Sequence, residues 1–448
     1  MLKTLVGAFK NKDIRKKILY TLMILVIVRV GSLLPIPGVD TEYFSSLLSG
    51  INTGDLSYLS AFTGGSFERM SLFALSITPY ITSSIIMQLL AIAIPKLEEM
   101  QKEGEDGRKK IAAITRYVTI ALALIESIAM AVGFGRSGLI KGYQGFSTLH
   151  YIVSIIVVVA ALTAGSAMLM WLGERITDKG IGNGISFIIL IGIIARFPDA
   201  LLQEVVSRVA NKSGGLIMFI IEIVFLLLVI GAAILLVQGT RKIPVQYAKR
   251  IVGNKQYGGA RQYIPLKVNA AGVMPIIFAQ AIMFIPITFI GFSNVNDAGG
   301  FLHAFTDHTS FWYNFVFAVM IILFTYFYTA ITINPTQMAE DMKRNNGFIP
   351  GIKPGKQTAE YIDDIMSRIT LPGSFFLALV AIMPAFAGIF GVQAGFAQFF
   401  GGTSLLILVG VVLDTLQQVE SHLLMRHYDG LLKSCLLYTS PSPRDMRR

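Results

Sequence analysis

The stretch SITPYITSSIIMQLL, residues 76–90, decides the fold because it reads as the start of a membrane-spanning helix with an unusual composition. Pro79 stands near its beginning, and several hydroxyl side chains follow among isoleucines. A proline inside a helix frees a backbone carbonyl and bends the helix, so neighbouring helices must satisfy that carbonyl. The stretch therefore predicts a bent helix that packs against other helices at bilayer depth.

The faces of this helix differ in chemistry. Ile81 and Ile85 are four residues apart and share one face, while Thr82, Ser83 and Gln88 lie on other faces. Ordinary packing between membrane helices also uses small and hydroxyl residues, which is one explanation of the polar side. The alternative is functional: the isoleucines face a pore, and the polar side meets a helix that can separate from it.

The whole composition supports a membrane setting. The 448 residues are 54% hydrophobic and 15% charged, whereas soluble domains carry about 25% charged residues. A span needs about 20 apolar residues, and long runs without alternation favour helices over a barrel. The predicted spans are 18–34, 71–94, 112–133, 151–172, 183–203, 215–237, 269–292, 311–333, 370–390 and 402–424.

The first span has an alternative interpretation as a signal peptide, since it is apolar and follows a basic segment. No small-residue cleavage site follows it, and LLPIPG does, so the sequence favours a retained helix. Lysine and arginine crowd the N-terminal segment and the connections after spans two, four, six and eight. The positive-inside rule then places both chain ends in the cytoplasm, which an even number of spans requires.

Three connections are longer than simple links. The cytoplasmic loops 238–268 and 334–369 mix glycine, proline, basic and apolar residues, which predicts ordered surfaces for docking a partner. The alternative is that they are basic loops that only fix topology. The outer connection Pro35–Met70 ends in LSAFTGGSFERM, which is broken by glycines and too short to span. Such a segment must line a cavity or be buried in protein, so it is a candidate to re-enter a pore.

Spans two and seven resemble each other weakly, in ALSITPYITSSII and NAAGVMPIIFAQAI. Because the two spans are five apart, this similarity suggests two inverted halves of five helices, as in many transport folds. A small-solute secondary transporter would fit the same arrangement. That alternative predicts a polar substrate site at the midplane, where this sequence places isoleucines.

Ionisable residues inside the spans are functional candidates by default. They are Arg29, Glu126, Arg196, Glu222 and Asp414. Glu126 lies deepest in its span and is the best candidate for a specific role, while the others fall closer to span ends. No series of acidic residues crosses the membrane as a proton relay would need.

The sequence holds no catalytic constellation. Cys435 is the only cysteine, which excludes an internal disulfide and a multi-cysteine zinc site. There is no P-loop, nucleophile elbow or paired-histidine metal motif, and GIGNGIS lacks the spacing of a dinucleotide site. An intramembrane protease would need a nucleophile and base that are missing here. We therefore expect no enzyme activity, no cofactor and no metal site.

Between Asp13 and Lys433 the chain resembles the SecY family, the channel subunits of the bacterial protein translocase. The motifs that carry the resemblance are PIPGVD, GGSFERMSLFALSITPYITSSIIMQLL, QKEGEDGRKKI, WLGERITDKGIGNGIS, IPLKVNAAGVMPIIFA, NPTQMAEDMKRNNGFIPGIKPG and GGTSLLILVGVVLD.

The resemblance implies an all-α polytopic membrane protein. Its ten transmembrane helices form two pseudo-symmetric, inverted five-helix halves around a central hourglass pore. The halves would be residues 18–203 and 204–425, after a cytoplasmic amphipathic segment at 1–17.

The resemblance also implies four groups of site residues. The pore ring would be Ile81, Ile85, Ile185, Ile189, Ile277 and Ile407. A plug at about 59–69 would include Leu59, Phe62, Gly64, Gly65, Phe67 and Arg69. Polar contacts across a lateral gate between spans two and three and spans seven and eight are assigned to Thr82, Ser83, Gln88, Glu126, Asn269 and Gln280. Docking would involve Arg241, Lys249, Arg250, Lys255, Arg261, Lys343, Arg344, Lys353 and Lys356.

The implied function is a non-enzymatic protein-conducting channel in the bacterial cytoplasmic membrane. It would translocate unfolded secretory preproteins with a signal sequence and release transmembrane segments laterally into the lipid bilayer. The implied partners are the small subunits SecE and SecG, the SecA ATPase and the ribosome.

Two places depart from the family pattern. Lys353 in GIKPG stands where arginine is usual, and lysine keeps the charge but loses the planar fork for paired hydrogen bonds. Residues 434–448, SCLLYTSPSPRDMRR, match nothing expected of the family, and we expect an artefactual or fused tail without function.

Overall fold

The structure is a computed structural model. It describes residues 11–41, 64–67, 69–135, 148–210, 215–247, 250–252, 255–257, 261–280, 282–283 and 310–437. The chain forms two compact units, and each is described by itself. The first unit is Met1–Ile51, Leu59–Ala195 and Val411–Arg448, and the second is Asn52–Tyr58 and Arg196–Gly410.

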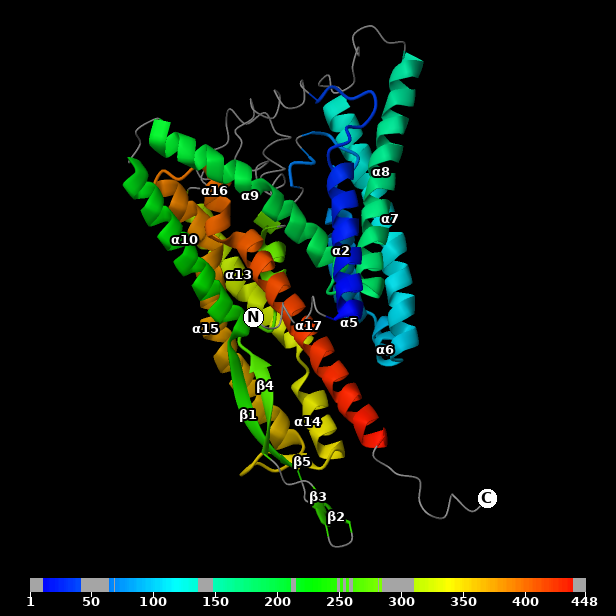
Figure 1. The fold of residues 1–448 in the computed structure, drawn as a ribbon, viewed down its shortest axis with the longest axis vertical. Helices are drawn as coiled ribbons and strands as arrows, with labels where there is room; N and C mark the ends of the chain where they lie inside the picture. The colour runs from blue at the N-terminus through cyan, green and yellow to red at the C-terminus, as the bar shows by residue number, and fades with distance from the viewer. Residues whose placement is uncertain are drawn as a thin grey trace. The chain divides into compact units, whose positions relative to one another are not determined.

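The first unit is built from long helices. In Figure 1, α5, α7 and α8 lie side by side, and α7 contacts both of the others. A buried core lies where α2, the residues before α5, α8 and α9 meet, and it contains Ile24, Phe73, Ile77, Leu169 and Ile188. The helices are α2 (Lys12–Gly31), α5 (Thr78–Ala93), α6 (Pro95–Lys102), α7 (Glu105–Gly135), α8 (Thr148–Lys179), the first part of α9 (Gly184–Ala210) and the last part of α17 (Gly402–Leu437).

The predicted bend at Pro79 is wrong. Helix α5 begins at Thr78, so Pro79 lies in its first turn, where no backbone hydrogen bond is lost. The preceding apolar residues form turns instead of helix, and Phe73 and Ile77 are each only 2% exposed. The bend lies at the other end: Thr78–Ala91 and Pro95–Gln101 meet at 104°. Proline disfavours helical backbone in the residue before it, which explains the break at this point.

The second unit combines helices with a small sheet. Its core contains Leu226, Phe396 and Phe400, with Phe197 packed against it. Its elements are the last part of α9, α10 (Gly215–Gln238), β1 (Thr240–Tyr247), β2 (Arg250–Val252), β3 (Lys255–Tyr257), β4 (Arg261–Lys267), α13 (Phe311–Thr332), α14 (Pro335–Arg344), β5 (Gly347–Phe348), α15 (Lys356–Ile389), α16 (Ala394–Ala397), η2 (Gln398–Phe400) and the start of α17.

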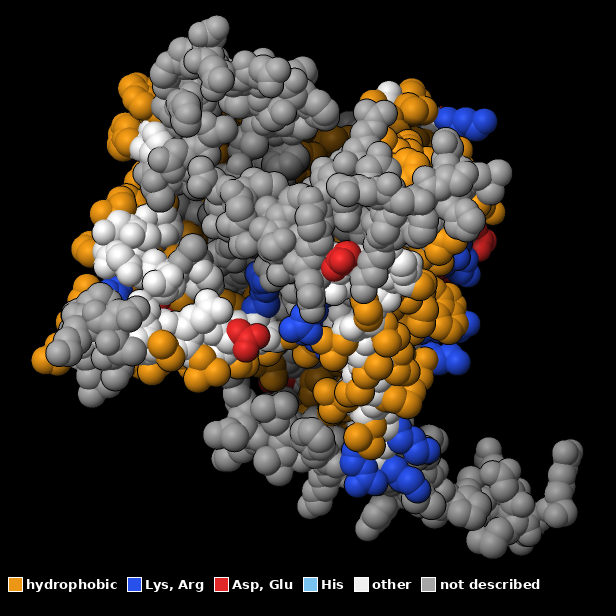
Figure 2. All heavy atoms as spheres, turned by 90° about the horizontal axis from the view of Figure 1, so that it is seen from above, with side chains coloured by type: hydrophobic (Ala, Val, Ile, Leu, Met, Phe, Trp, Pro, Cys, Tyr) orange, Lys and Arg blue, Asp and Glu red, His pale blue; other side chains and the backbone are white. Residues whose placement is uncertain are grey.

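Within the described part of the chain, seven helices are long and apolar enough to cross a membrane, or eight if the bent pair is one span. Helix α2 adds the predicted first span. Of the predicted seventh span, residues 274–280 and 282–283 are helical, and residues 284–292 lie outside the described residues. Large apolar side chains of the helices are exposed, as on α10, where Ile217 is 75% exposed. Figure 2 shows such side chains covering much of the visible described surface, as expected for helices solvated by lipid.

The two long cytoplasmic loops form strands, which the sequence reasoning did not predict. Strand β1 pairs antiparallel with β4, from Thr240↔Lys267 to Gln246↔Arg261, and β5 pairs with the end of β1 through Tyr247↔Gly347. Strands β2 and β3 pair separately with each other. The alternation of buried and exposed residues in KIPVQY, a strand pattern, was the available signal.

Candidate functional site

The isoleucine positions of the first unit gather on one core. Ile81 of α5 and Ile185 and Ile189 of α9 all pack against the buried cluster of α2, α8 and α9. Ile85, one turn further along α5, is 8% exposed. Three of the four predicted ring positions in this unit therefore belong to one apolar assembly.

The second unit holds the other two ring positions. Ile277 is half-buried within the helical residues 274–280, and Ile407 is 8% exposed on α17. Neither carries a polar group that would bind a passing chain. Their membership of a single ring with the isoleucines of the first unit stays a prediction.

The plug residues are described in part. Leu59 and Phe62 lie outside the described residues. Gly64 and Gly65 have φ values of +61° and +83°, in the left-handed region that favours glycine. Phe67 is buried and Arg69 is exposed.

The end of the plug segment is tied to the residues that lead into α5. The Ser71 backbone N–H donates to the Ser66 carbonyl at 3.0 Å, and the Ser71 hydroxyl donates to the same oxygen at 3.2 Å. The Ile36 N–H donates to the Met70 carbonyl at 3.1 Å, which fixes this segment to the chain after α2. The described residues of the segment thus have a defined seat inside the first unit.

The predicted gate residues of the first unit have different surroundings. Ser83 is fully buried, and its hydroxyl is hydrogen-bonded to that of Thr119 on α7. It therefore joins spans two and three to each other within the first unit, and a role across the gate stays a prediction. The Thr82 hydroxyl donates to a carbonyl of its own helix, Gln88 is exposed, and Glu126 is half-buried.

The gate residues of the second unit are Asn269 and Gln280. The Oδ1 atom of Asn269 is buried, and no hydrogen-bond partner for it occurs among the described residues. Gln280 is half-buried at the end of the helical stretch 274–280. Both side chains are consistent with polar contacts to a segment beyond those described.

A buried ion cluster in the second unit was missed by the sequence reasoning. Arg208 on α9 donates to Glu204 on the same helix at 2.9 Å and to Glu222 on α10, and the side chains of all three are at most 6% exposed. Glu204 also accepts the Gln393 backbone N–H at 2.8 Å, and Arg208 donates to the Phe390 carbonyl at 3.5 Å. The cluster therefore joins α9 and α10 to the turn between α15 and α16, which meet in Figure 1.

Sequence spacing offered one signal for this cluster. Glu204 and Arg208 are four residues apart, the spacing of an ion pair on a helix. Arg208 was instead counted among the charges of a connection, and Glu222 was placed near a membrane interface. The Oε2 atom of Glu222 has no hydrogen-bond partner among the described residues.

The cytoplasmic loops share one hydrophobic core. Ile243, Val245 and Leu266 from the first loop pack with Met342 and Ile349 from the second. We call this assembly of β1, β4, β5, α14 and the start of α15 the cytoplasmic body. Its core holds the two loops together as one surface.

The docking residues lie on this body where they are described. Lys249 lies outside the described residues, and the side chains of Arg250, Lys255 and Arg261 in β2, β3 and β4 are likewise not described. The five whose side chains are described are all exposed, and these are Arg241, Lys343, Arg344, Lys353 and Lys356.

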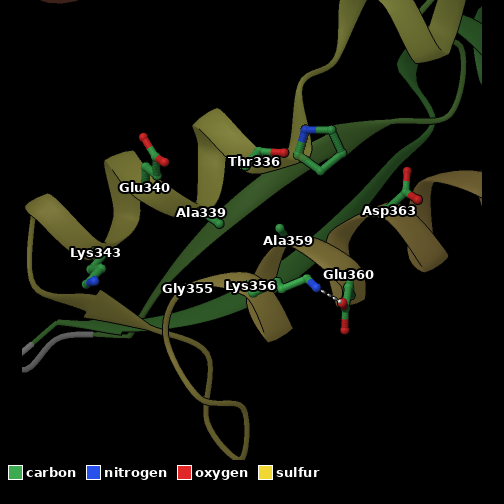
Figure 3. A pocket seen from close by; sticks show the side chains of 10 residues that line it. Thr336, Ala339, Glu340, Lys343, Gly355, Lys356, Ala359, Glu360 and Asp363 are labelled. Carbon is green, nitrogen blue, oxygen red and sulfur yellow. Dashed lines mark ion pairs between the residues drawn. The ribbon is translucent and has the colours of Figure 1, made fainter.

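A groove of about 550 Å³ lies between α14 and the start of α15 in the cytoplasmic body. Glu340 and Lys343 line it from α14, and Lys356, Glu360 and Asp363 line it from α15 (Figure 3). Lys356 and Glu360 form an ion pair at 3.9 Å. Charges of both signs in an open groove suit contact with a polar partner surface. Among the described residues, no group of three or more His, Cys, Asp or Glu side chains could hold a metal ion.

Known proteins share this architecture. Over 90% of this chain, the fold superposes on 91% of "The structure of a protein conducting channel" with a TM-score of 0.60 and 18% identity. "Sec61 in the Canine ribosome-channel complex from the endoplasmic reticulum" matches with a TM-score of 0.56 and 17% identity over 90% of this chain and 91% of that one. The fold is that of a multi-pass α-helical channel, which confirms the predicted fold class.

Sequence comparison identifies the family within this class. Residues 71–416 match the SecY family model. The protein translocase subunit SecY of Streptomyces coelicolor is 43% identical over 446 residues, which cover 97% of this chain and all of the relative. The chain belongs to the SecY family of protein-translocation channels.

Proposed function

We propose that this chain passes unfolded secretory preproteins across the bacterial cytoplasmic membrane, without chemistry of its own, and releases apolar segments sideways into lipid. The observation that carries the proposal is the apolar assembly around Ile81, Ile185 and Ile189 in a member of a translocase family. A secondary transporter would instead need a polar, substrate-specific site.

The six isoleucines would form a constriction through which the chain moves. An apolar constriction resists the passage of ions by dewetting. Branched, uncharged side chains offer no hydrogen bond or ion pair, so they hold no passing residue tightly. This combination suits a pore that accepts peptides of any sequence while limiting ion flow.

The plug and the gate complete this proposal. The residues that lead from Gly64 to α5 would close the channel at rest, because they are tied by backbone hydrogen bonds inside the first unit. Spans two and three would part from spans seven and eight to let an apolar segment leave. Polar contacts worth about 0.6–2 kcal/mol each would allow such a gate to open and close again.

The cytoplasmic body is the proposed docking surface for the SecA ATPase and the ribosome. Its exposed cations Arg241, Lys343, Arg344, Lys353 and Lys356 support this assignment. A structural relative comes from a ribosome-channel complex. Both chain ends would lie in the cytoplasm, and SecE and SecG would brace the two halves from within the membrane.

The experiment that tests the channel is a site-specific crosslink. In a chain carrying Cys435→Ser, Ile81→Cys is placed in the proposed ring and Leu227→Cys on α10, where the leucine is 63% exposed. A secretory chain with one cysteine is stalled during translocation, and disulfides are measured. We expect crosslinks from the middle of the stalled chain to position 81 and none to position 227. Crosslinks to 227 alone would exclude the isoleucine route.

A further inference from the structure

The backbone of the plug segment approaches α9 closely at one point. A Cβ atom placed on Gly64 would lie 2.8 Å from the Gly192 Cα and 2.9 Å from the Gly192 carbonyl oxygen. Real Cβ atoms do not come this close to other atoms, and a helix backbone cannot move aside as a side chain can. The contact therefore exists only because position 64 lacks a side chain.

The contact point lies on the isoleucine face of α9. Ile185, Ile189 and Gly192 follow the i, i+4, i+7 spacing, which places them on one face of the helix. Gly192 is buried. The plug segment is therefore seated on the surface that carries two of the proposed ring residues, one turn away from Ile189.

Arg29 of α2 lies on the same glycine. Its Nη1 atom is 2.7 Å from the position that a Gly64 Cβ would take. Arg29 is half-buried in the last turn of α2, and the sequence reasoning placed it near the membrane edge. A half-buried guanidinium brought against a backbone turn offers hydrogen-bond donors to that turn.

We propose that Gly64, Gly192 and Arg29 form the seat that positions the plug, so that the fit between two glycine backbones sets how often the resting channel opens. The proposal rests on the channel function given above. Gly192 supplies the surface without a side chain, and Gly64 supplies the left-handed backbone that lies on it. Arg29 covers the same turn from α2.

The test uses glycine-to-alanine substitutions in the full chain, reconstituted with its small subunits in planar bilayers. Gly64→Ala adds a methyl group at the contact, while Gly38→Ala adds one at a residue with φ +86° and nothing within 4 Å. Both variants carry the same left-handed strain, so their difference isolates the contact. We expect resting ion conductance to rise about tenfold in Gly64→Ala relative to Gly38→Ala, equivalent to ~1.4 kcal/mol.

A second pair keeps the test decisive if Gly64→Ala does not accumulate. Gly192→Ala is compared with Gly231→Ala on α10, where the added methyl meets nothing within 4 Å. Alanine favours a helix over glycine in both, so a leak in Gly192→Ala alone must come from the seat. Arg29→Gln should raise the leak by a smaller factor, because the glycine contact remains.

Two outcomes separate this inference from the channel function. If preprotein is translocated normally and the paired variants leak equally, the seat is excluded and the channel stands. If the unmodified protein translocates no preprotein with its motor and ATP, the channel function itself fails. A leak confined to the Gly64 and Gly192 variants, with translocation retained, supports the seat.

Discussion

The two units join their helices by different means. In the first unit, hydroxyl pairs connect neighbouring helices: Ser83 with Thr119 between α5 and α7, and Ser127 with Thr163 between α7 and α8. In the second unit, the Arg208 cluster connects α9, α10 and the turn after α15 through buried charges.

The difference lies in what remains when the contact breaks. The Thr119 hydroxyl also donates to the Thr115 carbonyl of its own helix at 2.7 Å, and the Ser83 hydroxyl reaches the Tyr80 carbonyl at 3.0 Å. Either hydroxyl can therefore leave its partner without becoming unsatisfied. A buried charge that loses its partner has no such alternative, and its desolvation is uncompensated. The first unit thus has joints that can open reversibly, and the second has one that holds.

The largest expected effect comes from removing the central cation of the cluster. Arg208→Met leaves Glu204 and Glu222 buried without a counter-ion, and breaking such a pair costs about 3–5 kcal/mol. We expect a clear fall in the midpoint of thermal unfolding in detergent. The control is Arg368→Met, which removes an exposed i, i+4 ion pair with Asp364 and should change stability little. Equal losses in both variants would mean that the cluster is not special.

Removing all three charges should cost much less than removing one. In Glu204→Gln/Arg208→Met/Glu222→Gln, no charge is buried, and the side-chain oxygen of residue 204 can still accept the Gln393 N–H. Replacing a complete buried ion group by neutral residues is often close to neutral. We expect the unfolding midpoint to recover most of the loss caused by Arg208→Met. A triple variant as unstable as the single one would show that packing of the arginine, and not charge, holds the joint.

Long uniform runs made the spans predictable from sequence. The predicted spans 215–237 and 311–333 correspond to α10 (Gly215–Gln238) and α13 (Phe311–Thr332). Such runs are apolar throughout and end at polar residues, so their limits follow from composition alone. Where apolar residues are buried in protein without being helical, as at Phe73 and Ile77, composition gives no such limit. The start of α5 was therefore placed too early, and the effect of Pro79 was misjudged.

The joints themselves could not be derived from sequence. The isoleucine face followed from helical periodicity, and Ser83 was recognised as a side chain that could bond a neighbour. Which neighbour it meets depends on how α5 packs on α7, and no spacing in the sequence encodes that. In the same way, Glu204 and Arg208 share a helix face by spacing, but Glu222 and the Gln393 N–H come from distant segments.

The smallest expected effect tests the reversible joint directly. Ser83→Ala removes the bridge to Thr119, and contacts of this kind between membrane helices average about 0.6 kcal/mol. A double-mutant cycle with Thr119→Val measures the coupling between the two hydroxyls as the non-additive part of the stability change. We expect a coupling below about 1 kcal/mol, since each hydroxyl has a carbonyl of its own helix to return to. The matching cycle of Glu204→Gln with Arg208→Met should give a coupling several times larger. If the two cycles gave equal couplings, the distinction between an opening joint in the first unit and a fixed one in the second would fail.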